Sequence, residues 1–143
     1  MKKLAFLILP FLLLPSYSFA ESYGNYQGAV YARNYDGDTI TFNLPGLHPI
    51  IGEKISIRVN GIDTPEIKGK CEREKYNATQ AKEMVADILK DAEIITLKNM
   101  ERGKYFRIAA DVIVDGENLA DVLVEAGMAV KYDSGKKTHK WCE

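Results

Sequence analysis

The chain has 143 residues, and its 19 lysines and arginines nearly balance 20 acidic residues, for a net charge of −1. This length suits one domain with a single hydrophobic core. Two cysteines with only two histidines make a poor ligand set for zinc, so a zinc-centred fold is disfavoured.

Residues 1–20 have the features of a secretory signal peptide. Lys2 and Lys3 precede an apolar run over residues 4–14, and a short stretch ending in the small residue Ala20 follows. The alternative is a membrane anchor, but the run is too short for a hydrocarbon core of roughly 30 Å. Removal of Lys2 and Lys3 with this segment leaves 17 basic and 20 acidic residues, a net charge of −3. That charge is mildly unfavourable for a polyanion binder but does not exclude one, because a bound divalent cation would offset it locally.

The first strands are predicted at residues 28–34 and 39–43, around a short turn, as in a β-hairpin. Because side chains alternate along a strand, Asp38 shares the core-facing side with Ile40 and Phe42. A carboxylate in that position is costly unless it is paired or binds a metal ion. Asp38 is therefore a candidate metal ligand.

A third strand is predicted at residues 54–62, and it leads into an acidic corner, residues 63–66. Pro65 fixes its own φ and keeps Thr64 out of the helical region, so the neighbouring carboxylates are held in an extended turn. Such a turn is a plausible oxygen-rich metal site. The same residues also fit an ordinary helix start, with proline in the first turn and an acid near the helix dipole. This stretch alone leaves both interpretations open.

The remaining segments are predicted, in order, as a loop at 44–49, a helix from about 76 to 91, a strand at 93–97, a charged turn at 98–106, a strand at 107–114, a helix at 118–126 and a polar, basic segment at 131–142. The first helix has an apolar stripe at helical spacing, which we assign to the core rather than to a cofactor site. Asn118 is a candidate N-cap of the second helix.

Three strands, a helix, two strands and a closing helix are the ingredients of an OB fold. We therefore predict a mainly β protein with helices, in the α+β class, built on a five-stranded OB-fold barrel with two or three helices. A small α+β sandwich has the same order of elements and stays open on pattern alone. We find no internal repeat or second domain, so residues 21–143 are expected to form one domain.

Cys71 and Cys142 are the only cysteines. In an exported protein an even pair favours a disulfide, which would close most of the domain into one loop. In the chain-entropy description such a loop contributes roughly 4 kcal/mol to stability. The alternatives are two free thiols or half of a metal site.

Three short blocks with charged and polar residues occur in order along the chain. They are Asp36-Gly37-Asp38-Thr39, then Arg58 with Gly61-Ile62-Asp63-Thr64-Pro65-Glu66, and finally Lys104-Tyr105-Phe106-Arg107. Together they resemble the thermonuclease family, also called the staphylococcal or micrococcal nuclease family. Each block alone is a weak signal, whereas three in this order are specific. The resemblance extends from about residue 28 to residue 132.

The resemblance implies an OB-fold, calcium-dependent phosphodiesterase that acts on DNA and RNA. Asp38 and Asp63 would bind Ca²⁺ through their carboxylates, and Thr64 would bind it through its backbone carbonyl. Glu66 would be the general base or would position the attacking water. Asp36 occupies a nearby acidic position that would act through water, although it is more readily explained as a turn former.

The same resemblance assigns the phosphate and nucleotide contacts. Arg58 and Arg107 would bind the scissile phosphate, and their planar forks suit phosphate oxygens in a way that lysine does not. Lys104, Tyr105 and Tyr132 would line the nucleotide site. Without the resemblance, both arginines could equally be strand-face residues paired with acids, and both tyrosines could be surface or barrel aromatics.

The sequence departs from the family pattern at its end. It stops soon after the second helix, so the long C-terminal helix of the best-known member is not expected. We expect a Cys71–Cys142 disulfide to replace that helix by pinning the end of the chain beside the catalytic loop.

The resulting hypothesis is an exported, monomeric, Ca²⁺-dependent endonuclease of DNA and RNA, periplasmic or secreted and without a membrane partner. The alternative is a non-catalytic OB-fold module that binds single-stranded nucleic acid or a protein partner. A binding module has no need of Arg58, Glu66 and Arg107 together, so their joint presence favours the enzyme.

Overall fold

The computed structural model describes residues 22–103, 107–133 and 135–143. The predicted signal peptide at residues 1–20 lies outside these ranges, as do Lys104 and Tyr105. Among the described helices, none is both long enough and apolar enough to cross a membrane.

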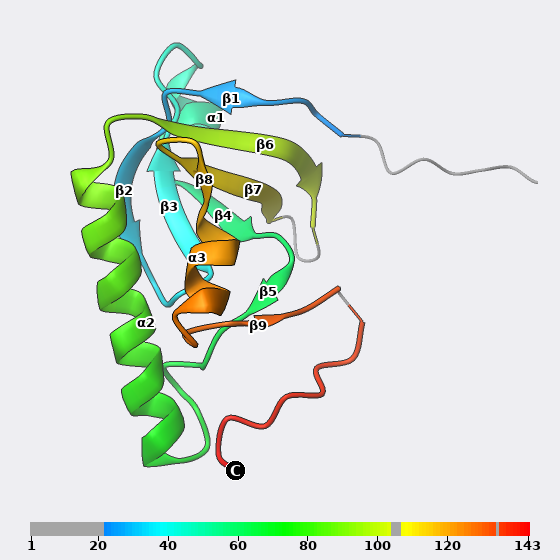
Figure 1. Cartoon of the computed structure of the whole chain (residues 1–143). Helices are drawn as coiled ribbons and strands as arrows, with labels where there is room; N and C mark the ends of the chain where they lie inside the picture. Colours follow the sequence, from blue (N-terminus) through cyan, green and yellow to red (C-terminus); the bar gives the residue numbers. More distant parts are fainter. Residues whose placement is uncertain (1–21, 104–106, 134) are drawn as a thin grey trace, which may run out of the picture.

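The fold is built on one curled sheet that forms a half-barrel (Figure 1). Its longer strands lie side by side in the order β2, β3, β4, β7, β6. Their bounds are Val30–Asn34 for β2, Thr39–Asn43 for β3, Ile55–Val59 for β4, Ile95–Arg102 for β6 and Ile108–Val114 for β7. Neighbouring strands are antiparallel except β4 and β7, which are parallel. The predicted OB-fold-like α+β architecture is therefore confirmed.

Four two-residue strands complete the described sheets and were not predicted, because two residues carry no periodic signal. They are β1 (Tyr26–Gln27), β5 (Ile62–Asp63), β8 (Glu117–Asn118) and β9 (Val130–Lys131). β1 pairs with β6 and β8 pairs with β7, whereas β5 and β9 form a separate two-stranded sheet. The β5–β9 pair matters for function because it ties the acidic corner to the end of the chain.

Three helices lie in the described part of the chain: α1 (Pro49–Gly52), α2 (Glu72–Asp91) and α3 (Leu119–Glu125). The predicted loop at 44–49 is present up to His48, and it leads into the unpredicted helix α1, which has proline at its start and is capped by the His48 side chain. The predicted cap of α3 by Asn118 is confirmed, since its side chain accepts a hydrogen bond from Ala120.

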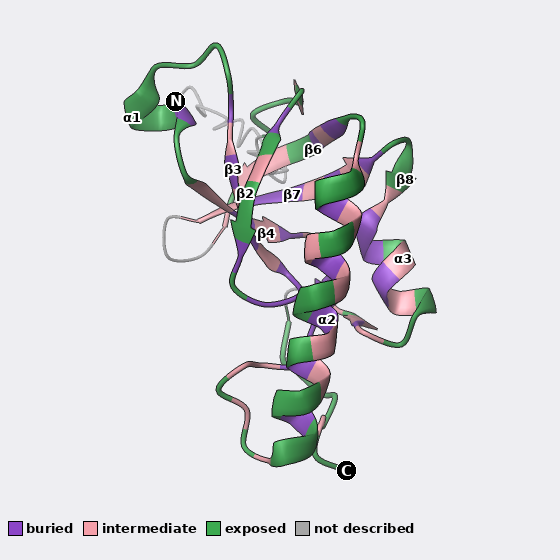
Figure 2. Ribbon diagram, turned by 90° about the vertical axis from the view of Figure 1, so that its left-hand side faces the viewer, coloured by how far each residue is buried: buried purple, intermediate pink, exposed green. Residues whose placement is uncertain are grey.

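Helix α2 begins earlier than the apolar stripe predicted. Cys71 caps its N-terminus by accepting a hydrogen bond from the backbone of Glu74, and Glu72 and Glu74 lie in the first turn, where acids favour the helix dipole. The helix runs along one side of the sheet, and its buried residues form a stripe while its outer face is exposed (Figure 2). The expected assignment of this stripe to the core is confirmed.

The core lies inside the curl of the sheet and contains Ile40 and Phe42, as the alternation in β3 predicted. Asp38 and Thr64 are buried as completely as these apolar residues, at 1% exposure each. Burying polar side chains such as these costs free energy unless they have partners, and the contacts of Asp38 and Thr64 are described in the next subsection.

Candidate active site

The register between β3 and β4 brings an acid and an arginine to the same end of the sheet. Thr39 lies opposite Arg58 in this pair. The backbone N–H of Val59 donates to the carbonyl of Asp38 at 2.9 Å. Asp38, the residue before β3, therefore meets Arg58, near the end of β4.

The turn before β3 is shaped by Asp36 and Gly37. Oδ1 of Asp36 accepts hydrogen bonds from the backbone N–H groups of Asp38 at 3.1 Å and of Thr39 at 2.8 Å, which is the geometry of a turn former. An added Cβ at Gly37 would lie 2.8 Å from Cγ2 of Thr64. Only glycine lets the turn pack this closely against the acidic corner.

The acidic corner lies directly beside Asp38. The backbone N–H of Thr64 donates to Oδ2 of Asp38 at 3.1 Å. Gly61, with a φ of 77°, supplies the left-handed conformation at the turn from β4 to β5. Asp63 is 3% exposed and so joins Asp38 as a second buried carboxylate.

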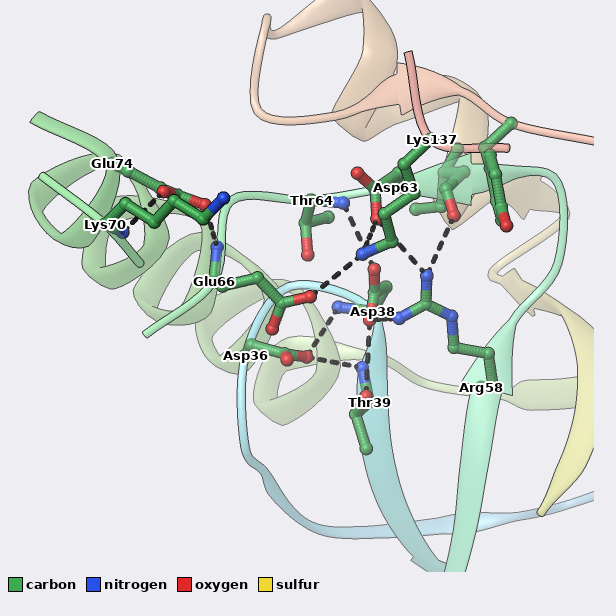
Figure 3. A network of polar contacts seen from close by, with 12 residues as sticks. Asp36, Asp38, Thr39, Arg58, Asp63, Thr64, Glu66, Lys70, Glu74 and Lys137 are labelled. Atoms are coloured by element: carbon green, nitrogen blue, oxygen red, sulfur yellow. Dashed lines mark hydrogen bonds and ion pairs between the residues drawn. The ribbon is translucent and has the colours of Figure 1, made fainter. Parts of the chain in front are cut away.

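Arg58 is the cation that both buried carboxylates share (Figure 3). Its guanidinium pairs with Oδ1 of Asp38, lies 3.6 Å from Oδ1 of Asp63 and donates to the carbonyl of Ile62 at 3.3 Å. Burial nevertheless raises the pKa of Asp38 to about 7, against the lowering effect of Arg58 and with a further increase from Asp36. The ionised form of Asp38 is thus under-compensated in the ion-free protein.

Next to these carboxylates is a pocket of about 520 Å³. Arg58 and Glu66 line it from β4 and the acidic corner, and Arg107 lines it from the residue before β7. The parallel pairing of Ile57 with Ile108 brings the start of β7 beside β4. The pocket wall therefore carries two guanidiniums and the half-exposed carboxylate of Glu66, together with Asp36, Glu101 and Lys137, beside the buried carboxylates of Asp38 and Asp63.

Tyr132 lines the same pocket from the residue after β9. Its backbone N–H donates to the carbonyl of Gly61 at 2.9 Å, and its hydroxyl donates to the carbonyl of Gly135 at 2.7 Å. Lys104 and Tyr105, which were expected at the nucleotide site as well, lie outside the described residues.

Lys137 is a site residue that sequence reasoning missed. Its ammonium lies 2.7 Å from Oδ1 of Asp63 and 2.9 Å from Oε1 of Glu66 (Figure 3). Burial lowers the pKa of Lys137, but the contacts with Asp63 and Glu66 outweigh that effect and the pKa is raised. The sequence shows a basic segment near the end of the chain, but nothing in it shows which lysine faces the pocket.

Glu74, also missed, shapes the segment between the acidic corner and α2. Its carboxylate accepts from the backbone N–H of Glu66 at 3.4 Å and from that of Lys70 at 2.9 Å. A detectable signal existed, since an acid three residues after a helix cap, here Cys71, is the spacing of a capping box. Glu74 is thus a support for the position of Glu66.

The predicted disulfide between Cys71 and Cys142 is present, with the two Cα atoms 6.0 Å apart. Together with Glu74, these cysteines are the one described group of three metal-ligating residue types whose ligand atoms all lie within 4.8 Å. Because the two sulfurs are bonded to each other, they offer no thiolates, and this cluster is not a metal site.

The acidic corner is a better match for a metal ion. Thr64 Oγ1 and Asp63 Oδ1 are buried and lack an aligned hydrogen-bond donor among the described residues, although the Lys137 ammonium lies close to Asp63. Asp38, Asp63 and Thr64 offer only oxygen atoms, which suit a hard cation such as Ca²⁺ that accepts irregular geometry. The residues present therefore fit Ca²⁺.

Comparison with known families gives a match that spans most of this site. A family model described as staphylococcal nuclease homologue matches residues 56–142, which is more than half of the chain. The match includes Arg58, the acidic corner, Arg107 and both cysteines, and it begins after Asp38. A search of curated proteins found no match.

Proposed function

Because the chain belongs to the staphylococcal nuclease homologue family, we propose that it is a Ca²⁺-dependent endonuclease that hydrolyses phosphodiester bonds of DNA and RNA. The supporting observation is a single pocket that Arg58, Glu66 and Arg107 line together, beside the buried carboxylates of Asp38 and Asp63. Phosphodiester hydrolysis requires positive groups that bind the phosphate, here guanidiniums, together with a carboxylate and an oxygen-rich cation site.

In this proposal Asp38 and Asp63 hold Ca²⁺ through their carboxylates, and Thr64 holds it through its backbone carbonyl. The ion, when bound, neutralises charge on a non-bridging phosphate oxygen and supplies waters for attack. With the carboxylates of Asp38 and Asp63 engaged in this way, Arg58 would no longer have to neutralise both of them, and its guanidinium would be available to the phosphate.

Glu66 accepts a proton from a water molecule that attacks phosphorus. A bond forms between the water oxygen and phosphorus as the bond to one ester oxygen breaks, and that oxygen takes up a proton from solvent water. Arg58 and Arg107 each present a planar fork to the phosphate oxygens and stabilise the charge that builds up in the transition state. Tyr132 contacts the nucleotide, and Lys104 and Tyr105 are proposed to do the same.

The proposed place of action is outside the cytoplasm, either in the periplasm or in the medium. The signal-peptide features of residues 1–20 support export. The Cys71–Cys142 disulfide supports an oxidising compartment, because such bonds rarely persist in the cytosol. We propose that the protein acts as a monomer.

The test is incubation of the purified protein with plasmid DNA, single-stranded DNA and RNA, in Ca²⁺ and in excess chelator. We expect cleavage in Ca²⁺ that the chelator abolishes. Glu66→Gln should slow cleavage by about 10² to 10⁴-fold while nucleic acid binding is retained, because the general base is lost but the phosphate contacts remain.

Glu83→Gln, on the exposed face of α2, is the matched control and should cleave at the wild-type rate. Cleavage that persists in chelator contradicts the calcium requirement. A wild-type protein that binds nucleic acid without cutting it would instead support the non-catalytic OB-fold module.

A further inference from the structure

The Lys137 ammonium lies on the carboxylates of Asp63 and Glu66, which are assigned above to the metal ion and to the base (Figure 3). We propose that Lys137 is a positioning residue that holds Asp63 and Glu66 in the ion-free protein and competes with the divalent cation for Asp63, so that it sets the affinity for the ion. This inference rests on the proposed function, and it concerns a residue to which that function gives no role.

An ammonium and a metal ion exclude each other at this position. Nζ of Lys137 is 2.7 Å from Oδ1 of Asp63, and Ca²⁺ binds carboxylate oxygens at roughly 2.3–2.6 Å. Arg58 and Lys137 already offset the charge of Asp63, so a divalent ion bound beside the ammonium would be repelled strongly in a site where Asp63 is only 3% exposed. Entry of the ion therefore requires the ammonium to move away.

Lys137 is the cation that can move. Arg58 belongs to β4, and its guanidinium is additionally held by the carbonyl of Ile62. Lys137 instead has a flexible side chain that is 47% exposed, in a segment without regular secondary structure.

The C-terminal tail, described at residues 132–133 and 135–143, places this lysine at the pocket. The tail is anchored at its start by the hydrogen bond from Tyr132 to Gly61. Its end is fixed by the disulfide from Cys142 to Cys71, and the carbonyl of Glu143 accepts from the side chain of Arg73 at 2.9 Å. Two anchors on either side of Lys137 keep its ammonium at high local concentration near the acids.

The experiment is calorimetric titration of Ca²⁺ into the full protein and its variants, with ion-free melting temperatures as a second readout. Lys137→Met should bind Ca²⁺ roughly threefold to tenfold more tightly, because the competing charge is gone. It should also melt at a lower temperature without ions, because Asp63 loses a counter-ion, and saturating Ca²⁺ should remove that difference. Lys137→Arg, which keeps a cation, should stay close to the wild type.

Lys136→Met is the matched control, since Lys136 is exposed and forms no ion pair with Asp63 or Glu66. An equal gain in Ca²⁺ affinity in this control would show that the gain comes from the change in net charge alone, and it would overturn the inference. Opening the tether with Cys142→Ser should also tighten Ca²⁺ binding, and it should add nothing in a Lys137→Met background.

The two proposals fail in different ways. A wild-type protein that binds Ca²⁺ and cleaves nucleic acid, with unchanged Ca²⁺ affinity in Lys137→Met, overturns the role of Lys137 alone. A purely structural lysine would lower the ion-free melting temperature without any gain in affinity, which also overturns it. A wild-type protein that binds no Ca²⁺ overturns the proposed calcium requirement together with this inference.

Discussion

The acidic corner and the C-terminal tail face the same pocket but are positioned by different means. The corner, residues 63–66, is fixed by contacts with sequence neighbours and adjacent strands, such as the bond from Thr64 to Asp38. The described tail residues after β9, 132–133 and 135–143, lie in no helix or strand, and the disulfide at Cys142 holds their end. The corner is therefore set by local sequence and sheet register, whereas the far end of the tail is held by the long-range disulfide and by the hydrogen bond from Arg73 to the carbonyl of Glu143.

Removal of the disulfide tests this difference most severely. Cys71→Ser with Cys142→Ser should lower the free energy of unfolding by up to about 4 kcal/mol and the melting temperature by roughly 10 °C. Serine at position 71 keeps a good helix cap, so the loss reports the tether rather than the cap of α2. Thermal unfolding with and without reductant is the measurement.

Below its melting temperature the disulfide-free protein should still cleave nucleic acid, because the acidic corner keeps its own contacts. If reductant leaves the melting temperature of the wild type unchanged, the tail is not pinned as described. If cleavage disappears in a folded, disulfide-free protein, the corner depends on the tail after all.

Arg58 and Arg107 line the same pocket but differ in their contacts with the buried carboxylates. Arg107→Lys and Arg58→Lys should each slow cleavage by about a hundredfold, because a lysine cannot present the planar fork. Only Arg58→Lys should also lower thermal stability, since Arg58 neutralises two buried carboxylates. Arg33→Lys, on the exposed side of β2, is the control and should change neither property. Equal stability of the two site variants would contradict the burial-based distinction.

The smallest effect, when counted per pH unit, is the pH dependence of stability in the absence of metal ions. The pKa of Asp38 is raised from 3.8 to about 7, so between these values the folded protein binds more protons than the unfolded chain. The free energy of unfolding should therefore fall as the pH rises through this window, by at most about 1.4 kcal/mol per pH unit. Urea unfolding in chelator measures this slope, and Asp38→Asn should flatten it. Identical slopes in the two proteins would be evidence against the burial of an ionisable Asp38.

Alternation along β3 was enough to predict that Asp38 points into the core, and the spacing of three blocks was enough to predict the family. These features are local, so one strand or one turn decides them. The disulfide was also predictable, because a chain with signal-peptide features and two cysteines has few alternatives.

Lys137 could not be assigned, because its position depends on the path of a tail that follows no periodic pattern. Its neighbours Lys136 and Lys140 have the same chemistry in the sequence, and only the coordinates distinguish them. The start of α2 was placed too late for a different reason, since the cap and first-turn acids of this helix precede its apolar stripe. End effects of this kind depend on side-chain hydrogen bonds rather than on hydrophobic spacing.

The most direct test is a crystal structure of the protein with Ca²⁺ and a nucleoside diphosphate. We expect one ion bound to Asp38, Asp63 and the Thr64 carbonyl, and a phosphate contacted by both Arg58 and Arg107, in the pocket that Glu66 lines. An ion bound elsewhere, or a phosphate that touches neither arginine, would contradict the proposed site.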